Sequence, residues 1–246
     1  MRRRVEAVVF DWGGTLTVDA DVDLADLWRV AARHLAAGSR EDEDRLVDVL
    51  LRVEAATWGR VVTDQAATTL DRILDEACRA TGLDVRAAVR AEAASLHLAR
   101  WAEHVRHRPD ALPTLQALQD AGYRCGLLSN THWPRAWHQA ILARDGLDGY
   151  LDATVYTSEL PHVKPHPSAF KAVLHALDVP DARRAAFVGD RLFDDVWGAS
   201  RLGMWTAHLV GSATWPEGSV VREAEVRPDA VLGQLGDVLR WVAEWS

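Results

Sequence analysis

In the second half of the chain, short apolar runs alternate with stretches of helical periodicity. The apolar runs predict strands at Arg124–Leu128, Ala153–Tyr156, Ala185–Val188 and Trp205–Val210. The stretches around them predict helices at Ala111–Ala121, Pro134–Arg144, Ser168–Leu177 and Asp194–Leu202. Strands and helices that alternate in this way form a parallel sheet with helices on both faces. We therefore predict an α/β fold.

The first strand is expected at Val5–Phe10, and a long helical stretch separates it from the other strands. Residues 19–104 carry apolar side chains at helical spacing, for example at Leu24, Leu27 and Trp28. No convincing strand interrupts this stretch. It is therefore expected to be a helical insertion after the first strand.

These patterns predict two structural units. A core domain is expected to comprise residues 1–18 and 105–246, and an all-helical cap domain to comprise residues 19–104. Residues 211–227 lack clear periodicity and predict a loop, and Leu232–Trp245 predicts a final helix.

Composition excludes several classes of function. The formal net charge of −8 argues against binding to a nucleic-acid backbone, which needs clustered positive charge. No apolar run reaches the roughly 18 residues that a membrane span needs. The basic start, Arg2–Arg4, leads into a short apolar run without a cleavage site, so we expect a cytoplasmic protein rather than a secreted one. The isolated Cys78 and Cys125 are expected to be buried apolar residues.

Four predicted strands end at residues that could perform chemistry. The first strand is followed by Asp11, the second by Ser129 and Asn130, and the fourth by Asp190, Asp194 and Asp195, while Lys164 lies in the loop near the third. Ligands of open parallel sheets bind outside the carboxyl ends of the strands. These residues are therefore expected to share one pocket.

The residue types in this pocket suit a phosphoryl group. Asp11 and Asp190 would repel each other unless a cation lay between them, and carboxylate oxygens are ligands that Mg²⁺ prefers. Lys164 and the hydroxyl of Ser129 could hold phosphate oxygens. Asp11 could then attack phosphorus to form an aspartyl-phosphate, while Gly13 and Gly14 would let the backbone approach the ligand.

Together these pieces resemble the haloacid dehalogenase superfamily. The resemblance rests on four motifs in family order, namely Phe10-Asp11-Trp12-Gly13-Gly14-Thr15-Leu16, Leu127-Leu128-Ser129-Asn130, Lys164-Pro165 and Val188-Gly189-Asp190-Arg191-Leu192-Phe193-Asp194-Asp195. It implies a Rossmann-like core with a helical cap inserted after the first motif. It also implies hydrolysis of a small phosphorylated metabolite through an aspartyl-phosphate.

The resemblance also assigns roles to residues. Mg²⁺ would be held by Asp11, the Gly13 backbone carbonyl and Asp190, while Asp194 or Asp195 would support the metal's waters or orient Lys164. Asp11 and Lys164 would be catalytic. The residues expected to bind phosphate are Gly14, Thr15, Ser129, Asn130 and Lys164. The plainer interpretations are that Ser129 ends a strand, Asp194 caps a helix and Lys164 is a surface charge.

Gly13 departs from the family's phosphatases. They have an aspartate two residues after the nucleophile, which protonates the leaving alcohol and later activates water. Loss of such a group costs about 10²–10⁴-fold in rate, and the cost is smaller for acidic leaving groups. Acyl phosphates, aryl phosphates and sugar 1-phosphates would therefore be affected least. Asp19 or Asp21 near the cap hinge could instead supply the proton.

Three alternatives remain at this stage. A dehalogenase of this family needs no metal and lacks the acidic fourth motif that Asp190, Asp194 and Asp195 provide here. A phosphonate hydrolase needs a cap lysine, and residues 19–104 contain none. A catalytically weak phosphate-binding protein of the same fold would explain Gly13.

Several aromatic residues and histidines near the motifs have no assigned role. Trp12 either shapes the pocket or only packs beneath the cap. His132, His162 and His166 lie near the site in sequence but without the spacing of metal ligands. The protein is expected to be a monomer or a homodimer.

Overall fold

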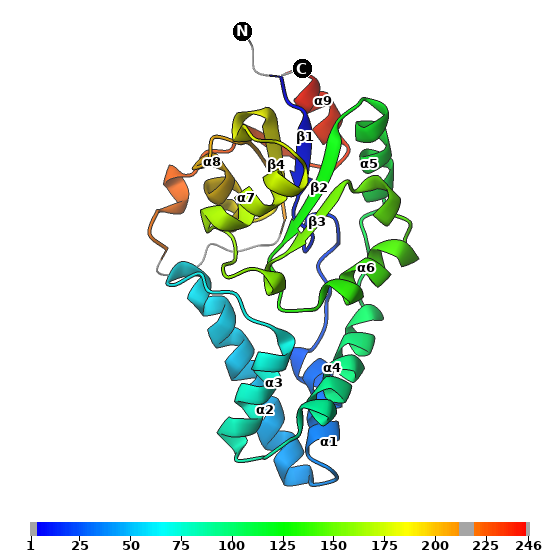
Figure 1. Ribbon diagram of the computed structural model, residues 1–246, viewed down its shortest axis with the longest axis vertical. Coiled ribbons are helices and arrows are strands. Elements are labelled where there is room, and N and C mark those ends of the chain that lie inside the picture. Colours follow the sequence, from blue (N-terminus) through cyan, green and yellow to red (C-terminus); the bar gives the residue numbers. More distant parts are fainter. Residues whose placement is uncertain (1–3, 212–218, 245–246) are drawn as a thin grey trace.

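The computed structural model describes residues 4–211 and 219–244. Its centre is a sheet of six strands in the order β3-β2-β1-β4-β5-β6 (Figure 1). The strands are β1 (Ala7–Phe10), β2 (Arg124–Ser129), β3 (Ala153–Tyr156), β4 (Ala185–Gly189), β5 (Trp205–Leu209) and β6 (Ala230–Leu232). Every neighbouring pair is parallel. The predicted α/β fold with a parallel, Rossmann-like sheet is confirmed.

Helices cover both faces of the sheet. They are α5 (Ala111–Asp120), α6 (Arg135–Arg144), α7 (Pro167–Ala176), α8 (Gly198–Ser200) and α9 (Asp237–Ala243). Within β1, Val8 and Phe10 pack into the core that contains side chains of α5, α6 and α9. Ala7 and Val9 pack into the opposite core with α7 and α8. Since β1 is buried on both faces, its sequence is continuously apolar.

Four helices between residues 24 and 102 form a separate bundle, drawn below the sheet in Figure 1. They are α1 (Leu24–Leu35), α2 (Arg40–Gly59), α3 (Leu70–Thr81) and α4 (Ala87–Ala102). Asp23, Ser39 and Thr69 cap the first three of them by accepting backbone N–H groups. The bundle has its own apolar core around Trp28, Leu50 and other buried side chains. It corresponds to the all-helical insertion that the sequence predicts after the first strand.

Backbone pairing occurs at two places near the boundary between the cap and the core domain. The two connecting segments pair with each other through an antiparallel bridge between Thr17 and His107. On the other side, the loop before α3 pairs with the core at Ala66 and His162. Three backbone hydrogen bonds reinforce this second contact: Ala67 N to Pro161 O, Val163 N to Gln65 O and Leu70 N to His132 O, at 2.8–3.0 Å. The boundaries at residues 18/19 and 104/105 stay predictions.

The carboxyl-terminal prediction is partly wrong. Residues 230–232 form strand β6 at the edge of the sheet, and the last helix begins only at Asp237 instead of Leu232. Gly233 and Gly236 interrupt the helical pattern, and backbone pairing with β5 holds Leu232 in the sheet. Within the predicted loop 211–227, residues 212–218 lie outside the described part of the chain, and Glu223–Glu225 forms a 3₁₀ turn.

Smaller differences concern two element starts. The first strand begins at Ala7 rather than Val5. The helix predicted from Asp194 begins with a π-helical segment, Leu192–Trp197, which runs into α8. Cys78 and Cys125 are buried free thiols, as predicted. Among the described helices, none combines the length and the apolar character that crossing a bilayer requires.

Candidate active site

The carboxyl ends of three neighbouring strands bring the predicted site residues together. Asp11 follows β1, Ser129 ends β2, and Asp190 follows β4; all three side chains are buried. Lys164, from the loop between β3 and α7, is also buried and joins them. A cavity of about 570 Å³ is lined by Asp11, Ser129 and Lys164 together with residues of the cap.

The Lys164 ammonium group lies between two carboxylates. Its Nζ donates to Asp11 Oδ1 at 2.6 Å and to Asp195 Oδ1 at 2.7 Å. Burial alone would lower the pKa of Lys164, but the charges of Asp11 and Asp195 outweigh burial and hold this pKa above its usual range. Lys164 is therefore a fixed cation beside Asp11, not a surface charge.

Asn130 holds the backbone that carries Lys164. Its side-chain Nδ2 donates to the Lys164 carbonyl at 3.0 Å, and its Oδ1 accepts from the Lys164 N–H at 2.8 Å. Asn130 also lines the cavity. Its amide group thus serves the lysine loop first, whereas the Ser129 hydroxyl makes no comparable contact with that loop among the described residues.

Three buried carboxylates form a cluster that could hold a metal. Asp11, Asp190 and Asp195 each offer an oxygen, and these oxygens lie within 4.8 Å of one another. Burial and the neighbouring charge of Asp11 raise the pKa of Asp190 to about 6. Thr15 Oγ1 donates to Asp190 Oδ1 at 3.0 Å, so Thr15 orients a carboxylate and is not among the residues lining the cavity.

The two aspartates at positions 194 and 195 differ in their contacts. Both oxygens of Asp195 are engaged, one by Lys164 and one by the Arg191 N–H at 3.0 Å. Asp195 therefore orients Lys164. Asp194 lines the cavity, and its buried Oδ1 has no hydrogen-bond partner among the described residues. This oxygen could accept a hydrogen bond from a water on a nearby metal.

Two glycines allow the carboxylates to approach the backbone. A Cβ at Gly14, whose φ is +80°, would lie 2.5 Å from Asp190 Oδ2, and one at Gly189 would lie 2.2 Å from Asp195 Oδ2. Both distances are too short for any side chain. The packing of oxygen ligands around these glycines fits a small hard cation such as Mg²⁺, which prefers such donors.

Gly13 is in the opposite situation. It lines the cavity, and a Cβ built on it would meet no atom within 4 Å. Its φ is not among the positive values. The absence of a side chain at position 13 is therefore not forced by packing or by the backbone.

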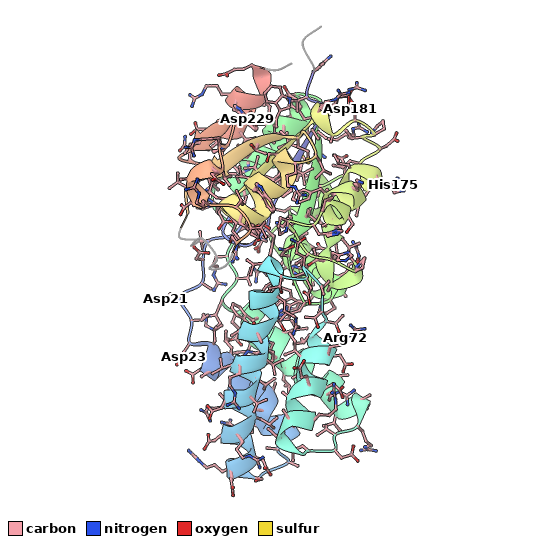
Figure 2. All side chains as sticks on the ribbon, turned by 90° about the vertical axis from the view of Figure 1, so that its left-hand side faces the viewer. Asp21, Asp23, Arg72, His175, Asp181 and Asp229 are labelled. Carbon is pink, nitrogen blue, oxygen red and sulfur yellow. The ribbon has the colours of Figure 1, made fainter. Side chains whose placement is uncertain are left out.

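Of the remaining candidate residues, some line the cavity and others do not. His132 and Asp19 line the cavity, whereas Asp21 is exposed on the linker at the outer edge of the molecule (Figure 2). His162 and His166 stack on each other at 3.8 Å between ring centroids and are not among the lining residues. Trp12 both lines the cavity and packs, since its Nε1 donates to His107 Nε2 at 3.2 Å.

Sequence reasoning missed the cap side chains that reach the cavity. Among them are Glu54 and Trp58 of α2 and Trp101 of α4. Glu54 does carry a signal, because it extends the buried positions Leu46 and Leu50 by one more step of four residues. A charged residue on the buried face of a helix calls for a partner or a function. Trp58 and Trp101 carry no such signal in a chain with 11 tryptophans.

The chain is similar in sequence to several curated phosphatases. Among curated relatives, a glyceraldehyde 3-phosphate phosphatase of Pyrococcus abyssi is 34% identical over 103 residues, which are 42% of either chain. The pyrophosphatase PpaX of Bacillus thuringiensis is 31% identical over 127 residues, 51% of this chain and 55% of that protein. The matched stretch thus spans about half or less of these relatives.

Solved structures match over nearly the whole chain. A HAD phosphatase from Thermococcus onnurineus has a TM-score of 0.63 at 22% identity and covers 98% of this chain and 99% of its own. A 2-haloacid dehalogenase from Pseudomonas syringae has a TM-score of 0.68 at 24% identity, covering 98% and 100%. At such identities the likeness shows the fold. The family model for haloacid dehalogenase-like hydrolases matches residues 5–203, a range that contains all four motifs, and the chain therefore belongs to this family of hydrolases.

Proposed function

We propose that the protein is a Mg²⁺-dependent hydrolase of a small phosphorylated metabolite that acts through an aspartyl-phosphate. The observation that carries this proposal is the buried ammonium of Lys164, held 2.6 Å from Asp11 Oδ1 beside the carboxylate cluster of Asp11, Asp190 and Asp195. A cation fixed next to a potential nucleophile suits a substrate that brings negative charge to the nucleophile.

Each residue has a role in this scheme. An oxygen of Asp11 attacks phosphorus, and Lys164 and Ser129 hold phosphate oxygens. Asp195 and Asn130 position Lys164 through the hydrogen bonds described above. Asp11, Asp190 and the Gly13 carbonyl would hold Mg²⁺, which would neutralise phosphate charge when bound. The cap of residues 19–104 would close over the substrate and exclude water.

The site argues against two other activities. The likeness to solved dehalogenases reflects the shared fold, because those chains are 24% identical or less. The buried carboxylates of Asp190, Asp194 and Asp195 would repel a carboxylate substrate. For a phosphonate hydrolase, the lysine-free cap offers no amine for a Schiff base.

The alternative of a catalytically weak phosphate-binding protein rests on Gly13 alone. The cytoplasmic location and the monomeric or homodimeric state stay predictions.

Phosphate release from a panel of phosphorylated metabolites and para-nitrophenyl phosphate, with Mg²⁺ or with EDTA, tests the proposal. We expect turnover only with Mg²⁺ and its loss in Asp11→Asn, while the exposed control Asp48→Asn retains the parent rate. Parent activity in Asp11→Asn would rule out the mechanism. Phosphate binding without any turnover would favour the binding protein, and chloride release from 2-chloropropionate would favour the dehalogenase.

A further inference from the structure

We propose that the leaving group of the substrate is a flat aromatic ring that carries a hydrogen-bond donor, so that the natural substrate is an aryl phosphate. This inference rests on the proposed function and deepens it, because Gly13 alone leaves acyl, aryl and sugar 1-phosphates as equal candidates. Two features favour one of these substrate classes. They are the aromatic wall of the cavity and the buried polar pair Glu54 and His132 within it.

Five aromatic side chains line the cavity. Trp12, His132 and Trp133 come from the core domain, and Trp58 and Trp101 come from cap helices α2 and α4. Neighbouring rings touch one another across the domain boundary: Trp58 and His132 lie 5.5 Å apart, His132 and Trp133 5.6 Å, and Trp133 and Trp101 5.1 Å between centroids. A planar ring can stack or pack edge-on against such a wall.

Away from Asp11, Ser129 and Lys164, the rest of the cavity wall is mostly apolar. Leu24, Leu51, Ala55 and Val105 also line the cavity. A sugar would need a polar partner for each hydroxyl group that it buries. The wall has a few polar side chains, among them Thr17, Asp19 and Thr131, but most of its surface is apolar, and it therefore favours an aromatic ring over a sugar.

Glu54 and His132 form a buried polar pair in this wall. They are 8% and 3% exposed, and both line the cavity. Glu54 Oε2 accepts from Trp28 Nε1 at 2.6 Å, and the Trp58 side chain also lies close enough to stabilise this carboxylate. Glu54 Oε1 lies 3.9 Å from His132 Nε2, beyond hydrogen-bond distance. Neither ring nitrogen of His132 has a hydrogen-bond partner among the described residues. Buried polar groups normally have partners.

A hydroxyl or amino group on the ring would complete this pair. Its hydrogen would be donated to Glu54 Oε1, and its oxygen or nitrogen would be within reach of His132. An acetyl group, the leaving side of a simple acyl phosphate, has no hydrogen to donate and too little surface to cover the tryptophans. The pair therefore selects a substituted ring.

The chemistry is consistent with Gly13. Asp11 would form a bond to phosphorus while the bond from phosphorus to the aryl oxygen breaks, and its electron pair would leave on the aryloxide. Water would then cleave the aspartyl-phosphate, which restores the Asp11 carboxylate and releases phosphate, and the protons of water would pass to phosphate and to the aryloxide. An aryloxide is a far weaker base than an alkoxide, so its departure needs no acid at position 13.

The test compares five substrates on the full chain with Mg²⁺: phenyl phosphate, 3-hydroxyphenyl phosphate, 4-hydroxyphenyl phosphate, glucose 1-phosphate and acetyl phosphate. We expect kcat/KM for phenyl phosphate to exceed that for glucose 1-phosphate by about tenfold or more. The better hydroxyphenyl ester should exceed phenyl phosphate by about tenfold, and Glu54→Gln should remove this second advantage only. Because an acetyl group is too small to pack against the aromatic wall, turnover of acetyl phosphate measures the phosphoryl-transfer chemistry separately from recognition of the ring.

Variants of Trp58 separate ring recognition from folding. Trp58 is partly exposed, at 37%, so Trp58→Leu should fold. We expect this variant to raise KM for the aryl esters about tenfold and to change kcat/KM for acetyl phosphate far less, so that the ratio of the two falls, while Trp58→Phe restores this ratio. An equal loss on all substrates, or a preference of the parent enzyme for glucose 1-phosphate, would overturn the aryl assignment alone. Absence of turnover with every substrate, acetyl phosphate included, would overturn the proposed function as well.

Discussion

At position 13 a glycine leaves open space beside the nucleophile. The lack of neighbours within 4 Å and the absence of a positive φ mean that a larger residue would fit there without displacing the carboxylate cluster. The phosphate-holding and proton-transferring parts of the chemistry can therefore be changed separately in this chain.

Gly13→Asp should introduce a general acid. We expect kcat/KM for alkyl phosphates to rise by about 10²-fold, at the lower end of what general acids contribute, and the rate for aryl esters to change little because their leaving group needs no proton. Steady-state phosphate release measures both. Gly13→Asn, which has the same shape and no acid, is the control, and an equal rise in that variant would contradict the explanation.

Gly14 should tolerate no side chain. In Gly14→Ala the new Cβ would press on Asp190 Oδ2 at a positive φ, so this carboxylate, the proposed metal ligand, must move. We expect about a 10²-fold loss in kcat, as for other displacements of about 1 Å, together with weaker Mg²⁺ activation. Gly59→Ala, where a Cβ meets nothing within 4 Å, should keep the parent rate; equal activity of both variants would show that the contact is unimportant.

The sequence predicts that the motif residues lie together, which the structure shows, while their roles stay predictions; the structure adds the cap residues. Asp11, Ser129, Lys164 and Asp190 could be placed because strand ends of a parallel sheet share one edge. Glu54 reaches the same cavity only through the packing of α2 against the core domain. Such a position depends on tertiary contacts, and helical periodicity cannot supply it.

Helix α2 serves two purposes along its length. Its first turns bury Leu46 and Leu50 in the cap core, and its last turns present Glu54 and Trp58 to the cavity. Under our proposal, stability of the cap and recognition of the substrate are therefore carried by different parts of the same helix.

The cap should lose stability in mild acid because of His97 in α4. Its ring stacks on Trp28 at 3.8 Å, and burial lowers its pKa to about 4. Because the folded state favours the neutral ring, the stabilisation is complete above the unfolded pKa of about 6.5 and is lost as the pH falls toward 4. These values correspond to a loss of about 2 kcal/mol in the free energy of unfolding between pH 8 and pH 5.

Urea unfolding at several pH values measures this loss. His97→Phe keeps an aromatic ring on Trp28 but removes the titration, so its free energy of unfolding should fall less between pH 8 and pH 5. Burial also lowers the pKa values of His132 and His138 to about 3, so part of the acid sensitivity should remain. An unchanged pH dependence in His97→Phe would contradict the assignment to His97.

Elements were predicted best where periodicity and burial agree. The sequence predicts strands β1–β5 and helices α5 and α7 within a few residues, since β1 and β4 are buried throughout and α5 and α7 each bury one face. Strand β6 was missed because its three residues are held by pairing with β5 and by no pattern of their own, and it lies at the exposed edge, where Val231 faces solvent.

At the scale of the whole molecule, metal binding should be coupled to folding. Bringing Asp11, Asp190 and Asp195 together costs electrostatic free energy, which a bound Mg²⁺ would offset in the folded state only. At a concentration of 100 times its Kd, Mg²⁺ should stabilise the fold by about 2.7 kcal/mol and raise Tm by about 5–10 °C. Thermal unfolding with and without Mg²⁺ measures the shift, and Asp190→Asn should reduce it; an equal shift in this variant would place the metal elsewhere.

The pairing of the loop before α3 with the core domain, at Ala66 and His162, should affect how ligands enter and leave the cavity. A cap joined only by its linkers could swing freely, but this one is also fastened where Leu70, Ala67 and Val163 make their backbone hydrogen bonds. One of these bonds ends on His132, which itself lines the cavity. Any wide opening of the cap about its linkers has to break these hydrogen bonds first. They would therefore set an energy barrier both for substrate entry and for product release.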